Sequence, residues 1–237
     1  MSPNRKRLAI VGAVVGVLLL LVVGGPFVYI HFFAGNTPAK LSLSSNDTTG
    51  GTGGTTTTTS GAPVPLAGTW TAGSGSTAGY RVQEVLFGQS TTAVGRTTSV
   101  RGSLTITGTT VTKAGFTVEM TAITSDKPQR DSQFQGIMDT AQFPQATFEL
   151  TSPIALGTPP ANGKVVTVQA TGKLTLRGQT RTITTPLQTE RNGNTIKVLA
   201  SIPVKFSDYG IANPSASFVT TQDHGIVEVL LVLKPGS

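Results

Sequence analysis

Short segments in which apolar and polar residues alternate fill the chain from Ala67 to Ser237. In the longest of them, Ile196–Val204, every second residue is apolar. This alternation is typical of a β-strand with one face buried and the other in water. Asn192-Gly193, just before that segment, favours a tight hairpin turn. The pattern predicts an all-β domain in which an antiparallel sheet of about eight strands closes on itself as a barrel.

The sequence before this domain has a different character. A run of 26 mostly apolar residues, Leu8–Phe33, follows the basic residues Arg5, Lys6 and Arg7. As a helix this run would reach about 39 Å, enough to cross a hydrocarbon core of about 30 Å. We therefore predict a cytoplasmic tail over residues 1–7, a single-pass transmembrane anchor over 8–33, and a C-terminal domain outside the cell membrane. A signal peptide that is cleaved to release a secreted protein is the alternative.

Residues 34–66 consist largely of Thr, Gly, Ser and Pro, with five consecutive threonines at Thr55–Thr59. Such a composition lacks the apolar side chains that offset the entropy of ordering a chain. We expect a disordered tether here. It would hold the folded domain, residues 67–237, away from the membrane, so that the domain does not dock onto the membrane.

The net charge of +7 does not indicate binding to nucleic acid. From residue 67 onward there are 14 Lys and Arg against 10 Asp and Glu, which leaves +4. These cations are scattered singly, whereas a surface that follows phosphates has them clustered. The chain also has no cysteine, so disulfides and thiol chemistry are excluded.

One short segment breaks the β pattern. Within Arg130–Leu150, the apolar residues Phe134, Ile137 and Met138 have helical spacing. Pro144 is expected to end this helix, because proline has no N–H to donate. The alternation over 146–150 then predicts a strand.

Residues suited to catalysis or metal binding are few. His224 is the single histidine of the domain, so a zinc site built on histidines is excluded. Asp223 is adjacent to His224, and adjacent strand residues point to opposite faces, so we expect no hydrogen bond that would orient the imidazole. Glu119, Glu149 and Glu228 lie opposite apolar faces and are expected to face solvent. We predict a protein that is not an enzyme and has no metal or cofactor; an exported hydrolase that uses converging carboxylates is a weaker alternative.

The predicted barrel has room either for packed side chains or for one small ligand. Apolar inward-facing residues are what any barrel core requires. Periodicity therefore leaves two possibilities open, a ligand-binding barrel and a solid-cored interaction module.

Several motifs occur in the order found in one known family, and together they cover nearly all of residues 67–237. The chain resembles the YceI-like family of lipocalin-like barrels. The motifs are Thr69-Trp70 with Val100–Leu104, Arg130-Asp131, Phe143-Pro144-x-Ala146-x-Phe148, the G-K-L-T-L-R-G-x-T-R run of 172–181, and F-S-D-Y-G-I at 206–211. The segment 71–88 departs from the family, since it lacks the H-S-x-[VI]-x-F pattern.

The resemblance implies an elongated antiparallel barrel, capped by a helix, around a long apolar tunnel that holds a polyisoprenoid or another long-chain lipid. It also implies that Arg130 and Asp131 hold the capping helix by hydrogen bonds. With the predicted anchor, the function would be that of a membrane-tethered, extracytoplasmic lipid carrier; the alternative is a solid-cored cell-surface module without a ligand. The tunnel-lining residues that the resemblance implies are Phe116, Val118, Met120, Phe134, Phe148, Leu174, Leu176, Val198, Ile202 and Phe206.

Overall fold

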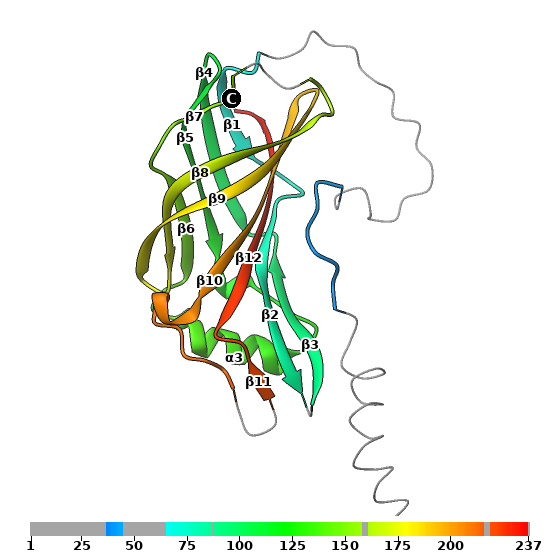
Figure 1. Cartoon of the computed structure of the whole chain (residues 1–237), viewed down its shortest axis with the longest axis vertical. Helices are drawn as coiled ribbons and strands as arrows, with labels where there is room; N and C mark the ends of the chain where they lie inside the picture. Colours follow the sequence, from blue (N-terminus) through cyan, green and yellow to red (C-terminus); the bar gives the residue numbers. More distant parts are fainter. Residues whose placement is uncertain (1–36, 45–64, 87, 158–160, 216–218, 237) are drawn as a thin grey trace, which may run out of the picture.

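The computed structural model of the chain describes residues 37–44, 65–86, 88–157, 161–215 and 219–236. These residues form a twelve-stranded antiparallel sheet, two 3₁₀ turns, η4 (Met120–Ala122) and η5 (Phe206–Tyr209), and helix α3 (Pro128–Met138) (Figure 1). The strands are β1 (Gly68–Ala72), β2 (Thr77–Leu86), β3 (Gln89–Thr97), β4 (Val100–Thr107), β5 (Thr110–Glu119), β6 (Gln145–Leu150), β7 (Ile154–Ala155), β8 (Val165–Leu176), β9 (Gln179–Asn192), β10 (Thr195–Lys205), β11 (Val219–Thr221) and β12 (His224–Pro235).

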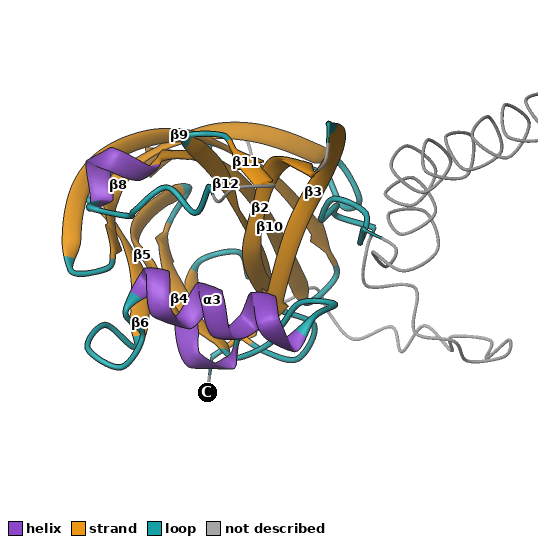
Figure 2. Cartoon of the chain, turned by 90° about the horizontal axis from the view of Figure 1, so that it is seen from below, coloured by secondary structure: helices purple, strands orange, loops and turns teal. Residues whose placement is uncertain are grey.

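Eight of these strands close into a ring. Their order is β1–β4–β5–β6–β8–β9–β10–β12, and β12 pairs back onto β1. The closing ladder joins Trp70 to Pro235 and Ala72 to Leu233. The view along the barrel shows the strands surrounding its interior (Figure 2). The predicted closed antiparallel barrel of about eight strands is thus confirmed.

The lower part of the wall in Figure 1 has a different construction. The C-terminal half of β12 pairs with β1, whereas its N-terminal half pairs with β2, from Leu230 opposite Thr77 to Ile226 opposite Arg81. β3 pairs with β2 along its whole length, and an isolated bridge between Arg96 and Thr124 links β3 to the chain after η4. The β2–β3 hairpin therefore forms one side of this end of the barrel.

The central ladders place alternate residues inside, as the alternation predicted. Ala200 on β10 lies opposite Val229 on β12, and Ile202 lies opposite Val227. Both β10 residues and Val229 are buried in one continuous apolar core. The hairpin predicted at Asn192-Gly193 joins β9 to β10, and Gly193 has a φ of +57°, in the left-handed region that glycine adopts without steric cost.

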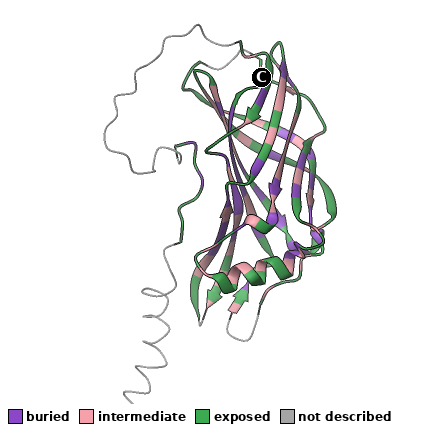
Figure 3. Cartoon of the chain, turned by 180° about the vertical axis from the view of Figure 1, so that it is seen from behind, coloured by how far each residue is buried: buried purple, intermediate pink, exposed green. Residues whose placement is uncertain are grey.

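Helix α3 covers the lower end of the barrel beside the β2–β3 hairpin (Figure 2). It ends earlier than expected. Asp139 adopts a left-handed conformation, and its N–H donates to carbonyls of the last turn, so the helix stops at Met138 and not at Pro144. Pro144 instead directly precedes β6, which matches the strand predicted over 146–150. The outer face of α3 is exposed (Figure 3), while Phe134, Ile137 and Met138 face the barrel.

Residues 37–44, here called the strap, are ordered, although they belong to the segment expected to be disordered. The strap packs on the outer face of the barrel, where Leu41 and Leu43 are buried against Leu199 and Leu230. Lys197 Nζ donates to the carbonyl oxygen of Leu43 at 2.8 Å. Two buried leucines and this hydrogen bond therefore help to attach the strap. Residues 45–64 lie outside the described part of the chain.

The strap also explains why Glu228 does not face solvent as predicted. Glu228 does lie on the outer face of β12, but it is only 2% exposed. Arg81 Nε lies 3.3 Å from one of its carboxylate oxygens, and Arg96 Nη2 lies 3.1 Å from the other. The same two arginines donate to backbone carbonyls of the strap, Arg81 to Pro38 at 2.6 Å and Arg96 to Ala39. The strap thus covers a face that alternation alone marks as outward.

The predicted single-pass location also requires correction. Within the part of the chain that the structure describes, no helix combines the length and apolar character needed to cross a membrane. Residues 8–33, on which the prediction depended, lie outside the described residues.

Candidate functional site

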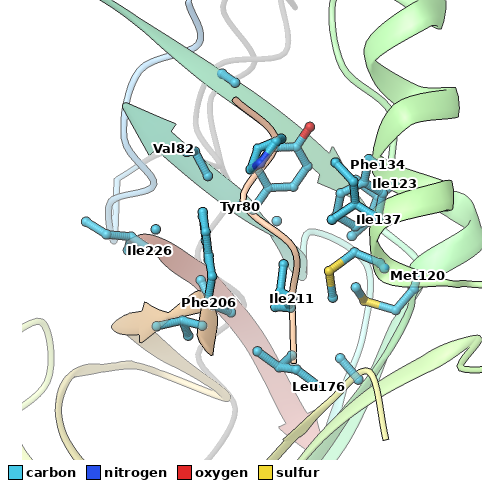
Figure 4. Close-up of a pocket in the computed structure, with 18 of the residues that line it drawn as sticks. Tyr80, Val82, Met120, Ile123, Phe134, Ile137, Leu176, Phe206, Ile211 and Ile226 are labelled. Atoms are coloured by element: carbon cyan, nitrogen blue, oxygen red, sulfur yellow. The ribbon is translucent and has the colours of Figure 1, made fainter. Parts of the chain in front are cut away.

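The barrel interior contains two apolar cavities, one above the other along β8, β10 and β12. The lower cavity, of about 130 Å³, lies between the β2–β3 hairpin, α3 and the lower ends of β10 and β12 (Figure 4). Its wall includes Tyr80, Val82, Met120, Ile123, Phe134, Ile137, Leu176, Phe206, Ile211 and Ile226.

An aromatic pair joins α3 to the hairpin at this cavity. The rings of Tyr80 on β2 and Phe134 on α3 stack with their centroids 4.8 Å apart and their planes 7° from parallel. The Tyr80 ring lies over Gly95 of β3, where an added Cβ would stand 2.9 Å from Tyr80 Cζ. Helical spacing brings Phe134 to this position, and the absence of a side chain at Gly95 makes room for its partner.

A few polar groups border the lower cavity. Burial raises the pKa of Tyr80 to about 12 and also raises the pKa of Glu84, because burial disfavours the charged form of each group. Arg130 also lines the cavity and forms an ion pair with Asp126. Asp131 accepts hydrogen bonds from the backbone N–H and the hydroxyl of Ser125, at 2.7 and 2.6 Å. Asp131 therefore fixes the start of α3, while Arg130 stands at the cavity wall.

The upper cavity is larger, about 380 Å³, and its wall comes from β4, β5, β6, β7, β8, β9, β10 and β12. Phe116 on β5 and Phe148 on β6 stack there with their centroids 5.6 Å apart. The apolar part of the wall includes Leu104, Ile106, Val111, Val166, Val168, Leu187, Ile196, Val198, Ala200, Val229, Leu231 and Leu233.

Residues before and within β1 close the barrel near the upper cavity. The Trp70 side chain is 1% exposed, and its indole N–H donates to the carbonyl of Leu66 at 2.9 Å. The guanidinium of Arg191 lies 5.8 Å from the Trp70 ring centroid, within the range of a cation–π contact. Leu66 itself also lines the upper cavity.

The sequence-predicted lining residues divide between the two cavities. Val118, Met120, Phe134, Leu176 and Phe206 line the lower one, whereas Phe116, Phe148 and Val198 line the upper one. Leu174 and Ile202 line neither, although they are only 1% and 2% exposed.

A comparison with family models and solved structures identifies this architecture. The model of the YceI-like domain matches residues 70–233. The chain belongs to the YceI-like family.

Two solved structures of similar fold are a polyisoprenoid binding domain from Saccharophagus degradans, implicated in plant cell wall breakdown, and BcnA from Burkholderia cenocepacia. The first is 16% identical, with a TM-score of 0.58 over 72% of this chain and 99% of that one. The second is 22% identical, with a TM-score of 0.50 over 65% of this chain and 95% of that one. No curated protein sequence matches the chain.

Sequence reasoning missed several lining residues of this YceI-like domain. Tyr80 and Val82 lie in the segment 71–88 that departs from the family pattern, so no motif marked them. Ile123 follows η4, outside any alternating segment. Leu187 and Ile196 do belong to the alternating segments, and their inward position was the available signal.

The structure also corrects the expectation for Asp223 and His224. His224 Nδ1 lies 2.8 Å from Asp223 Oδ1, and this hydrogen bond lowers the pKa of the Asp223 carboxyl. The alternation rule fails here because Asp223 precedes the first residue of β12. Both side chains are exposed and border neither cavity. Among the described residues, no group of three or more His, Cys, Asp or Glu side chains is placed to hold a metal ion.

Proposed function

We propose that this YceI-like barrel sequesters or carries a polyisoprenoid or another long-chain lipid in its interior, with no catalytic step. The observation that carries the proposal is the upper cavity, an unfilled apolar space of about 380 Å³ inside a closed barrel. This volume lies in the range of small-molecule sites, roughly 300–1,000 Å³. A tightly packed barrel core would leave few voids larger than a water molecule.

The chemistry of the wall favours a hydrocarbon ligand. Both cavities are lined mainly by aliphatic and aromatic side chains, with a minority of polar ones. Each CH₂ removed from water contributes about 0.8 kcal/mol, so a long chain binds well without a charged contact. The solved domain from Saccharophagus degradans is described as polyisoprenoid binding, and we extend that ligand class to this chain.

The alternative, a solid-cored interaction module, requires an interior filled by its own side chains. The two cavities argue against it. It also predicts that the purified protein contains no lipid, which gives a direct test.

The full chain should be purified and extracted with organic solvent, and the extract analysed by mass spectrometry. A prenyl or other long-chain species at a stoichiometry near one per chain supports the lipid carrier. An extract without such a species, combined with no uptake of added prenyl alcohol by the purified protein, favours the solid-cored module.

A further inference from the structure

We propose that Phe148, Leu174 and Ile202 form a partition across the barrel, and that this partition limits the length of lipid chain that one chamber accepts. The inference depends on the proposed lipid-binding function and adds a specificity-determining element to it. It starts from the finding that two of the most deeply buried inward residues line neither cavity.

The boundary can be followed on two strands, β10 and β8, which β9 separates in the sheet. On β10, Val204 lines the lower cavity and Ala200 the upper one, and Ile202 stands between them. On β8, Leu176 lines the lower cavity and Val168 the upper one. The residues of the same face between them are Ala170, Gly172 and Leu174, of which Leu174 has the largest side chain.

β6 completes the partition. Ala146 lines the lower cavity, whereas Phe148, two residues on, lines the upper one. Phe148 lies opposite Leu174 in the β6–β8 ladder. The Phe148 side chain therefore stands at the same level as Leu174, on the upper side of the boundary.

The Phe148 ring is held in place from two sides. It stacks on Phe116, and it covers Gly172 of β8, where an added Cβ would lie 2.6 Å from Phe148 Cε2. Gly172 thus provides a recess in the wall that keeps the ring in one position. A ring fixed in this way forms a stable boundary, since closely packed interiors resist the displacement of one side chain.

The partition has a measurable consequence. Affinity for a hydrocarbon chain rises with each carbon buried, and it stops rising when further carbons remain in water. A chain confined to one chamber therefore reaches a plateau of affinity at a short length. Removal of the partition joins the chambers and moves that plateau to longer chains.

The experiment compares linear prenyl alcohols of increasing length on the delipidated full chain, by displacement of a fluorescent fatty-acid probe. The variants are Phe148→Ala and Ile202→Ala, so that the test survives if one of them fails to fold, as judged by circular dichroism. Val165→Ala is the control, because it shortens an exposed apolar side chain of β8 that lines neither cavity.

We expect the affinity of the unmodified chain and of Val165→Ala to level off at the same alcohol. In Phe148→Ala and Ile202→Ala, affinity should continue to rise for at least one more isoprene unit, by about tenfold or more. One unit has five carbons, and at about 0.8 kcal/mol each their burial exceeds the 1.4 kcal/mol that corresponds to a tenfold change in affinity. Identical plateaus in all four proteins would overturn the partition while leaving lipid binding intact. No binding of any alcohol by any of them would instead overturn the proposed function itself.

Discussion

At the scale of single residues, the lower cavity places a few polar groups among apolar side chains, and Tyr80 shows the effect of this burial. Tyr80 stacks on Phe134 inside this environment, and its burial raises its pKa from 10.0 to about 12. The folded state therefore favours the neutral phenol more than the unfolded state does.

This shift gives a pH-dependent contribution to stability. The contribution is fully present below pH 10.0, and it is lost as the pH rises towards about 12. Tyr80→Phe should remove this loss and also abolish the tyrosinate absorbance step near pH 12. Burial also raises the pKa of Tyr209, so Tyr209→Phe is the control in which the step that belongs to Tyr80 should remain. Ionisation of Tyr80 at an ordinary tyrosine pKa would contradict its burial against α3.

Gly172 illustrates how one missing side chain positions another. Gly172→Ala would place a Cβ 2.5 Å from the carbonyl oxygen of Glu149 and against the Phe148 ring. Overpacking of this kind costs about 1–3 kcal/mol. Denaturant unfolding should show this loss for Gly172→Ala. Gly136→Ala, in a helix with open space around the added Cβ, should be neutral or stabilising. Equal stability of the two variants would show that Phe148 is not confined by the recess.

At the scale of elements, the strap is an addition to the domain that the family model covers, since that match begins at residue 70. The strap contacts β2 and β3 through Arg81 and Arg96, and β10 through Lys197. The strap therefore crosses the outer face of the barrel and links the β2–β3 hairpin, which bounds the lower cavity, to β10.

The two strap leucines should account for a measurable part of the stability. Replacing Leu41 and Leu43 together with alanine removes buried apolar contacts, and we expect a loss of at least about 2 kcal/mol. In a thermal melt this corresponds to a decrease in Tm of roughly 4–8 °C. Ser44→Ala, at an exposed strap position, is the control and should melt like the unmodified chain. An unchanged Tm in the double variant would show that the strap does not stabilise the barrel.

The elements differ in how far the sequence predicts them. The alternation over Ile196–Val204 specifies a strand and its inner face without reference to any other segment. The position of the strap depends instead on Leu230 and Arg81, which are distant in sequence, and its polar composition gives no sign of these partners. The early end of α3 likewise depends on the left-handed conformation of Asp139, which competes with the more visible signal of Pro144.

The same limit applies to the candidate site. Alternation shows that Leu174 and Leu176 face inward, but it does not show the space around each side chain. Leu174 could line a cavity or lie in the proposed partition between the two cavities. Which of these holds depends on Phe148 and Ile202, which come from other strands. The set of inward residues was therefore accessible from the sequence, and the division of the interior was not.

At the scale of the whole molecule, an unfilled interior links lipid content to stability. A ligand that binds the folded state alone stabilises it by about 2.7 kcal/mol at a concentration of 100 times its Kd. Extraction of the lipid should therefore lower the Tm of this YceI-like barrel, and addition of a prenyl alcohol should restore it.

A side chain that fills the upper cavity should take the place of the lipid and also supply its stabilising effect. Ala200 is buried at this wall, so Ala200→Phe places a ring in the space that the lipid would occupy. Filling a cavity commonly adds about 0.5–2 kcal/mol to the free energy of unfolding, so this variant should be at least as stable as the delipidated chain. It should also contain less lipid, and added prenyl alcohol should raise its Tm only slightly. Ser201→Phe adds the same ring to the exposed face of β10 and should retain both lipid and its effect on Tm. If Ala200→Phe folds and still takes up the same amount of lipid, the lipid does not bind in the upper cavity. The phenylalanine ring and a lipid cannot occupy the same space.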